Sequence, residues 1–253
     1  MNKSVQITGI IPTYNEELHI ESAIDSLAFV DEILVIDSYS TDKTVELAKA
    51  KGVRIVQRVF DDFSSQKNYA IDLASHTWVF LLDADERIPV KLQQEVIFEV
   101  NQESTSTAYW IRRSNFFMKR RIKYSGWKND KVIRLFKKEE CKYNGKLAHE
   151  EIHTTGTISI LNNYLDHYTY KDFNSFIKKK NLYAQLQAQE LAKKGQKTTF
   201  LHFIFKPSFR FIKHFILQKG FLDGIEGFFI ATFYAYTIFA RYVNLWLINR
   251  GLK

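Results

Sequence analysis

Residue types that are scarce already restrict what this 253-residue chain can be. Cys141 is the single cysteine, so an internal disulfide and a Cys/His zinc cluster are both excluded, and a reducing compartment is expected. Only 3 Pro and 10 Gly are present, which argues against a disordered or low-complexity chain. Because 45% of the residues are apolar, the composition predicts a folded protein with one sizeable core.

Common phosphate-binding loops and long apolar runs are missing as well. No G-x-G-x-x-G follows the first predicted strand, and no G-x-x-x-x-G-K-[ST] occurs in the sequence. The first residues include a short apolar run without the features of a signal peptide, so we expect a cytoplasmic protein. The uncharged stretch 227–240 is shorter than the roughly 20 residues that cross a bilayer, so a transmembrane helix is not expected.

Acidic residues are rare in one segment of the chain. Between Lys171 and Lys219 there are eleven Lys and Arg residues against two acids, a net charge of +9, so the remainder is close to neutral at −1. Within this segment, residues 200–220 alternate bulky apolar and basic side chains, which is typical of helices in a membrane interface. We expect the segment to bind an anionic membrane surface, peripherally, at the inner face of the cytoplasmic membrane. A core or a homo-oligomer interface made by the same aromatic residues is the alternative.

The first third of the chain alternates short apolar strands with amphipathic helices. Strands are predicted at 5–11, 32–37, 53–59 and 78–83, with helices at 15–28, 41–52 and 64–75 between them. This alternation predicts a mostly parallel sheet with helices on both faces. Ligands of such sheets bind outside the carboxyl ends of the strands.

The predicted secondary structure no longer alternates between strands and helices after residue 105. Antiparallel strands are predicted at 108–117, 131–138 and 157–170, and the chain from about residue 172 is predicted to be helical. The sequence therefore predicts an α/β protein with a mixed sheet and a helical C-terminal region.

The fourth predicted strand runs directly into two aspartates, Asp83 and Asp85. If the extended backbone continues through Ala84, both carboxylates project to the same side, about 7 Å apart, and repel each other. A divalent cation that also carries phosphate oxygens would relieve this repulsion. The alternative is that the two aspartates cap the helix that begins near Pro89.

Several segments together resemble a known family. PTYNE (12–16), IDSYSTD (36–42), SQKNYA (65–70) and LDADE (82–86) resemble, in this order, the inverting family 2 glycosyltransferases with the GT-A fold. NGKLAHEE (144–151) and LDHYTYKDF (165–173) make the resemblance closer to the small bacterial enzymes that add hexoses to the lipopolysaccharide inner core. The resemblance covers about the first 170 residues.

The resemblance implies how the chain is organised. A GT-A catalytic domain would span residues 1–170, with a nucleotide-binding half at 1–100 and an acceptor half, which carries the base, at 101–170. A helical region, membrane-associating or oligomerising, would span 171–253.

The resemblance also implies which residues form the site. The residues implied for donor binding are Pro12, Thr13, Tyr14, Glu16, Asp37, Asn68, Asp83, Ala84 and Arg134. Asp83, Asp85 and His167 would hold Mn²⁺ or Mg²⁺, and Glu150 would be the general base. Without the resemblance, His167 reads as a core histidine, Glu16 as a helix cap and Glu150 as part of a charged surface turn.

The expected function is therefore a metal-dependent, inverting transfer of a hexose. Glucose from UDP-glucose is the expected donor, and a lipid-linked saccharide such as the lipopolysaccharide core is the expected acceptor. A polyprenyl phosphate or a protein is the alternative acceptor. A nucleic-acid-binding protein is the alternative of another class, but Asp37, Asp83, Asp85 and Glu86 would repel a phosphate backbone, so no nucleic acid is expected. The pair Ser38-Tyr39 replaces the Asp-Gly that is frequent in the family, which affects recognition of the base.

Overall fold

The structure is a computed structural model that describes residues 5–102, 105–144, 151–168 and 173–252. The chain forms two compact units. Unit 1 comprises Met1–Arg113 and Asp130–His167, and unit 2 comprises Ser114–Asn129 and Tyr168–Lys253. The chain therefore passes three times from one unit to the other.

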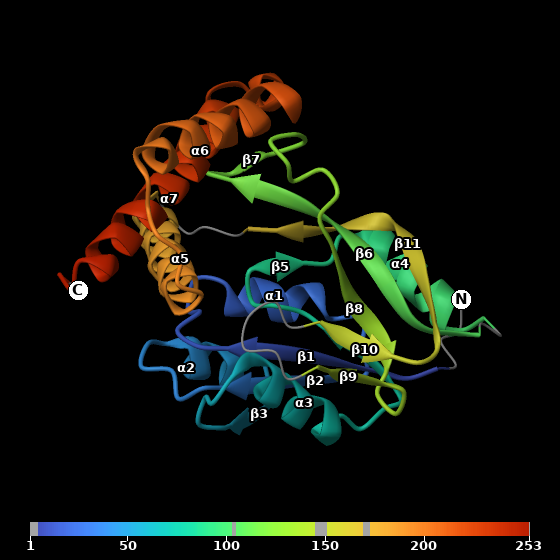
Figure 1. Cartoon of the computed structure of the whole chain (residues 1–253). Coiled ribbons are helices and arrows are strands. Elements are labelled where there is room, and N and C mark those ends of the chain that lie inside the picture. Colours follow the sequence, from blue (N-terminus) through green and yellow to red (C-terminus); the bar gives the residue numbers. More distant parts are fainter. Residues whose placement is uncertain (1–4, 103–104, 145–150, 169–172, 253) are drawn as a thin grey trace. The chain divides into compact units, whose positions relative to one another are not determined.

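Unit 1 is an α/β unit (Figure 1). Its helices are α1 (Ile20–Ser26), α2 (Thr44–Ala50), α3 (Phe63–Leu73) and α4 (Val90–Val100). Its strands are β1 (Ile7–Thr13), β2 (Glu32–Asp37), β3 (Arg54–Gln57), β4 (Trp78–Leu81), β5 (Glu86–Arg87), β8 (Lys131–Lys137), β9 (Cys141–Tyr143), β10 (Ile152–Thr154), β11 (Thr157–His167) and the first part of β6 (Ser106–Phe117).

The main sheet is mixed, with strand order β3-β2-β1-β4-β8-β6-β11-β5. The first four of these strands are parallel, and β8 then pairs antiparallel with both β4 and β6. Strands β9 and β10 form a separate antiparallel pair. The carboxyl ends of β1, β2 and β4 thus meet at one edge of the sheet, where the sequence predicts the site.

Helices cover both faces of this sheet, and β1 shows why. Ile7 and Ile11 pack into a core cluster with residues of α1 and α4, while Ile10 packs on the other face with Ile71 of α3. Successive side chains of a strand point to opposite faces of the sheet. Because helices cover both faces, β1 is apolar at consecutive positions. The mixed sheet between two helical layers confirms the predicted α/β fold.

The first helix is shorter than predicted. It was expected at 15–28 but begins at Ile20, because Asn15 has a left-handed backbone (φ 55°) and residues 14–19 form a turn.

Unit 2 is mainly helical, and its helices α5 and α6 each lie beside α7 (Figure 1). Its elements are the end of β6, β7 (Arg120–Arg121), α5 (Phe173–Lys193), α6 (Phe200–Ile212), the π-helical turn η1 (Lys213–Leu217), the 3₁₀ turn η2 (Gly220–Asp223) and α7 (Gly224–Asn249). Phe117, Phe176 and Ile230 form the centre of one apolar cluster of this unit. The helical C-terminal region is thus confirmed. Within the described ranges, no helix combines the length and hydropathy of a bilayer-spanning segment.

Candidate active site

The loops that follow β1 and β2 are tied to each other by hydrogen bonds. The backbone N–H of Asn15 donates to Ser40 Oγ (2.9 Å), and the N–H of Thr41 donates to Asn15 Oδ1 (2.8 Å). Asn15 and Tyr39 both have left-handed backbones, at φ 55° and 60°. Tyr39 occupies the second position of the family's frequent Asp-Gly pair, where glycine would adopt this conformation at no steric cost.

Asp37 and Glu16 also form hydrogen bonds within this pair of loops. Asp37 is fully buried and accepts from the Ser40 N–H (3.0 Å) and from Gln57 Nε2 (2.9 Å). The N–H of Glu16 donates to Thr44 Oγ1 (2.7 Å), and its carbonyl accepts from Ile20 at the start of α1. Both acids therefore lie at the rim formed by the carboxyl ends of β1 and β2.

Three further predicted donor-binding residues follow one another along the same rim. Pro12 and Thr13 end β1, and Thr13 is buried. Tyr14 begins the loop and is exposed. The exposed side chain of Tyr14 is accessible to a ligand at this edge of the sheet, and its role stays a prediction.

Asp83, Ala84 and Asp85 lie on a turn and not on an extended strand, so the expected extended geometry is wrong. Strand β4 ends at Leu81, and the N–H of Glu86 donates to the carbonyl of Asp83 (2.9 Å). Ala84 is buried inside the turn. The alternative of helix capping is not seen either, because the N-cap of α4 is Pro89, with no side-chain cap bond.

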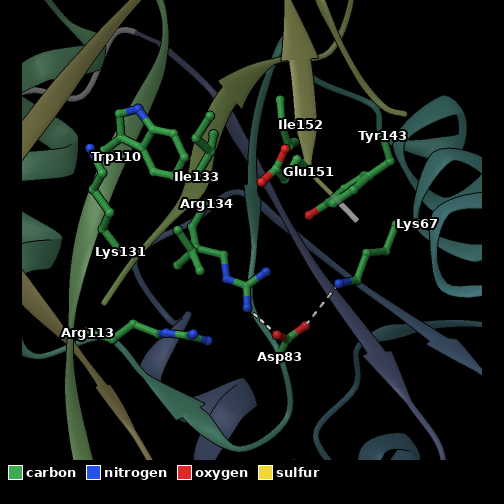
Figure 2. Close-up of a pocket in the computed structure, with 11 residues that line it drawn as sticks. Lys67, Asp83, Trp110, Arg113, Lys131, Ile133, Arg134, Tyr143, Glu151 and Ile152 are labelled. Carbon is green, nitrogen blue, oxygen red and sulfur yellow. Dashed lines mark hydrogen bonds and ion pairs between the residues drawn. The ribbon is translucent and has the colours of Figure 1, made fainter. Parts of the chain in front are cut away.

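Asp83 lies in a group of cations (Figure 2). Its carboxylate pairs with Arg134, and its Oδ1 lies 3.6 Å from Lys67 Nζ. Burial works to raise the pKa of Asp83, but the charges of Arg134, Lys67 and Arg113 outweigh it and hold that pKa well below its usual range. Asp83 is therefore ionised at any physiological pH.

A β-bulge places Arg134 in this group. Tyr109 pairs with Leu135, but the next residue, Trp110, pairs with Ile133, so Arg134 is the extra residue in β8. Bulges re-aim a side chain that would otherwise follow the alternation of the strand. Here the buried guanidinium of Arg134 reaches Asp83 and also donates to Glu86 Oε1 (2.8 Å).

Glu86 contacts both arginines of this group, Arg113 and Arg134. It is fully buried, and its Oε1 lies 3.6 Å from Arg113 in addition to the bond from Arg134. Arg113 is also paired with Asp130, to which its Nε donates at 2.9 Å and its Nη2 at 2.8 Å. These contacts fix two arginines next to Asp83, which fits a site that binds a multiply charged anion.

The cavity in front of Asp83 has a volume of about 310 Å³ (Figure 2). This is within the range of small-molecule sites, about 300–1,000 Å³. It is lined by Lys67, Asp83, Trp110, Arg113, Lys131, Val132, Ile133, Arg134, Tyr143, Glu151 and Ile152. Four basic side chains against two acids make it an electropositive cavity, with the rings of Trp110 and Tyr143 on its walls.

Asp85 and His167 face each other in the structure. Asp85 Oδ2 lies 3.5 Å from His167 Nε2, and His167 ends strand β11, which pairs with β5 through His167 and Glu86. The described part of the chain contains no group of three or more His, Cys, Asp or Glu residues arranged as a complete metal site. One carboxylate and one imidazole fit Mn²⁺ or Mg²⁺ when the phosphates of the substrate supply the other ligands. Asp83, the third predicted ligand, is engaged by Arg134 and Lys67.

Asn68 and Glu150 complete the predicted set. The side-chain amide of Asn68 bonds both backbone groups of Tyr143, at 3.1 Å to its carbonyl and 2.9 Å from its N–H, and so joins α3 to β9. Glu150 lies outside the described residues, but Glu151 lines the cavity. The roles of Asn68 and Glu150 therefore stay predictions.

Most residues of the cavity wall are not predicted as site residues from the sequence. The sequence predicts only strand positions for Trp110, Arg113 and Lys131, and no role for Tyr143. The available signal was the pair Arg112-Arg113 directly after the apolar run Ala108–Ile111, since a charged residue in a partly buried strand needs a partner. The partner, Asp130, follows only from the pairing of β6 with β8.

Comparison with known proteins gives relatives over nearly the whole chain. A glycosyltransferase of Rickettsia conorii, itself uncharacterised, is 29% identical in an alignment of 266 positions that covers 97% of this chain and 92% of that protein. The lipopolysaccharide core biosynthesis glycosyltransferase LpsC of Rhizobium meliloti is 25% identical in an alignment of 236 positions that covers 90% of this chain and 87% of LpsC.

Solved structures and a family model were compared as well. Glucosyl-3-phosphoglycerate synthase from Mycobacterium tuberculosis, in complex with Mn²⁺, UDP-glucose and glycerol 3-phosphate, matches with 27% identity over 46% of each chain, at a TM-score of 0.38. That score is too low to support a structural argument. The model of glycosyl transferase family 2 matches residues 8–167. This match covers more than half of the chain, so the protein belongs to glycosyl transferase family 2.

Proposed function

We propose that this glycosyltransferase moves a hexose, with inversion, from a UDP-sugar to a lipid-linked saccharide such as the lipopolysaccharide core. The observation that carries the proposal is the electropositive cavity around Asp83, next to the Asp85–His167 pair. A nucleoside diphosphate that leaves during transfer gains negative charge, and fixed cations lower the free energy of that state.

The donor side of the proposal rests on the rim and the cations. The loops that contain Asn15 and Asp37 would take the nucleoside, and Lys67 and Arg134 would face the diphosphate. Asp85 and His167, with Asp83, would hold a divalent cation, which when bound neutralises phosphate charge. Glucose is the proposed sugar, by the family resemblance.

The acceptor side needs a base. Glu150 would take the proton of the acceptor hydroxyl while that oxygen bonds to the anomeric carbon on the face opposite the leaving UDP. The electron pair of the broken bond leaves with the diphosphate, and the configuration at the anomeric carbon inverts because the new bond forms on the opposite face. Trp110 and Tyr143, on the cavity wall, offer flat apolar faces against which a sugar ring can pack.

The acceptor class is supported by the relative that acts in lipopolysaccharide core biosynthesis. A polyprenyl phosphate or a protein is the second candidate for the acceptor. A lipid-linked acceptor would place the reaction at the inner face of the cytoplasmic membrane.

A transfer assay combined with nucleotide binding tests the proposal. Asp85→Asn should abolish the stabilisation of the protein by UDP that depends on Mn²⁺, measured as a shift of the thermal midpoint, and lower the transfer rate by about 100-fold or more. Glu150→Gln should leave the thermal shift with UDP and Mn²⁺ unchanged and lower the turnover by about 100-fold or more.

The control is Glu139→Gln, an exposed acid outside the cavity, which should retain wild-type transfer and UDP binding. Loss of turnover in Glu151→Gln, with normal turnover in Glu150→Gln, would assign the base to Glu151. Wild-type transfer in the presence of a chelator would contradict the role of the cation.

A further inference from the structure

Helix α6 is apolar on two opposite sides, and α7 covers one of them. None of the residues of α6 is fully buried. On the covered side, Phe203 packs against Phe239 (ring centroids 6.2 Å apart), and His202 stacks on Tyr242 (4.5 Å). Phe211 packs against Phe228 in the same way (5.9 Å).

The opposite side of α6 and η1 carries what we call the outer stripe. Its members follow at intervals of four, four, three and four residues, which places them on one side of a helix. The outer stripe consists of Leu201, Phe205, Phe209, Ile212 and Ile216. Between 46% and 64% of the surface of each of these residues is exposed. A continuous row of large, exposed apolar residues marks a surface that binds something.

The cations beside the outer stripe indicate what it binds. Residues 191–222 contain seven Lys and Arg residues and no Asp or Glu. Lys206, Arg210 and Lys213 belong to α6 and η1 themselves. Within the described ranges, none of these three forms an ion pair with a carboxylate. Lys206 and Lys213 lie at the border of the outer stripe, so their charges are available to a partner, whereas Arg210 acts on the buried side chains of Lys180 and His214.

A second copy of the chain is a poor occupant for this surface. In a symmetric dimer the same patch meets itself, so the cations of one copy would face those of the other with no acid in between. An anionic lipid bilayer complements both features, because acyl chains accept the apolar stripe and headgroup phosphates accept the cations.

We propose that the outer stripe and its flanking cations are the surface by which the protein docks on an anionic membrane. Helix α6 would lie in the plane of the interface, with Phe205 and Phe209 among the acyl chains and Lys206 and Lys213 at the level of the phosphates. Helix α7 supports α6 from behind and does not insert. This inference concerns unit 2 alone, so it can fail while the proposed transferase reaction stands.

Vesicle sedimentation of the full-length protein tests the docking surface. The wild type should sediment with vesicles of equal parts phosphatidylglycerol and phosphatidylcholine, and much less with phosphatidylcholine alone. Phe205→Ser/Phe209→Ser should weaken partitioning by about tenfold or more, because two large apolar side chains no longer leave water. Lys206→Gln/Lys213→Gln should weaken it about 25-fold, since each cation near an anionic surface contributes roughly fivefold.

Matched controls test whether membrane binding depends on the outer stripe itself or on any exposed apolar or basic residue of the protein. Leu182→Ser/Leu186→Ser removes two exposed apolar residues of α5, and Lys49→Gln/Lys91→Gln removes two exposed cations of unit 1. Both control proteins should sediment like the wild type. All variants lie on the surface, so their circular dichroism spectra should match that of the wild type.

Three results would overturn the proposal. The first is a wild type that stays in the supernatant with both kinds of vesicle. The second is that variants of the outer stripe sediment as well as the wild type. The third is a wild-type dimer in light scattering that Phe205→Ser/Phe209→Ser converts to a monomer without a change in vesicle binding, because the stripe would then contact a second copy.

Discussion

At the scale of single residues, Lys180 of α5 is a buried cation that forms no ion pair with any acid in the described part of the chain. Only 7% of its surface is exposed, and its ammonium lies 3.8 Å from the centroid of the Tyr234 ring and 5.3 Å from that of Phe176. Such cation–π contacts contribute about 2 kcal/mol when desolvated. Burial lowers the pKa of Lys180 to about 8, and the charges of Lys179 and Arg210 act in the same direction.

Lys180→Met should therefore stabilise the protein at pH 7, by about 1–3 kcal/mol, because a desolvated charge is replaced by an apolar chain of similar length. The gain should shrink between pH 8 and about 10.5, the usual pKa of lysine. Over this window Lys180 is neutral in the folded wild type, so the free-energy cost of burying a charged ammonium disappears. Arg210 stays charged throughout, and burial lowers the pKa of His214, which packs on Tyr234, so neither masks the effect. Urea unfolding at pH 7 and pH 9.5 measures both quantities.

The control for this substitution is Lys178→Met, which changes an exposed lysine of the same helix and should leave the stability within about 0.5 kcal/mol. If Lys180→Met were less stable than the wild type at both pH values, the cation–π contacts would outweigh the cost of burial.

At the scale of elements, Glu32 at the start of β2 joins three segments of unit 1. Its carboxylate accepts from Thr8 Oγ1 on β1, from Arg54 Nη1 on β3 and from the backbone N–H of Ser75, each at 2.8 Å. Burial works to raise the pKa of Glu32, but these hydrogen bonds outweigh it and lower the pKa to about 2.

Glu32→Gln should lower the free energy of unfolding at pH 7 by about 2 kcal/mol. A folded-state pKa below the usual 4.5 means that the ionised carboxylate stabilises the protein above pH 4.5 and that this contribution disappears as the pH falls toward 2. The difference between variant and wild type should therefore narrow between pH 7 and pH 3 in urea titrations. Glu46→Gln, on the exposed side of α2, should show no such narrowing. An equal difference at both pH values would contradict the pKa argument.

The elements also show what the sequence can and cannot predict. Strand β2 was predicted with its observed bounds, 32–37, because a short run rich in the β-branched residues Ile and Val favours a strand over a helix. The bulge at Arg134 was not predicted, since residues 131–138 read as a regular strand, and the pairing of β8 with β6 decides which side chain is the extra one. The acidic rim was therefore predictable from local motifs, and Arg134 from the family resemblance, whereas the contacts of Arg134 and Arg113 with the acids depend on the register of β8 and β6.

At the scale of the whole molecule, residues 114–129 fold with the helices that follow them some 50 residues later in the sequence. Asp223 of η2 is buried and accepts from the N–H groups of Lys123 (2.9 Å) and Tyr124 (3.0 Å) and from Ser125 Oγ (2.8 Å). One carboxylate thus organises a loop about 100 positions earlier in the chain.

Asp223→Ala should open this loop, because two backbone donors and a hydroxyl lose a charged acceptor, at a cost of about 2–4 kcal/mol. Hydrogen exchange of the full-length protein should become faster over residues 120–127 and remain unchanged in β1 and β2. Unchanged exchange at 120–127 would show that other contacts hold the loop. Asp25→Ala, at an exposed acid of unit 1, is the control.

The paired loops after β1 and β2 have a consequence for the entry of a nucleotide. Asn15, Ser40 and Thr41 hold both loops in place through bonds that involve no ligand. Little conformational freedom is then left for an incoming nucleotide to remove, so the free energy of binding is not reduced by the cost of ordering these loops. The left-handed backbone of Tyr39 belongs to this arrangement. The free-energy cost of holding the loops in this conformation is met when the protein folds and does not recur at each binding event.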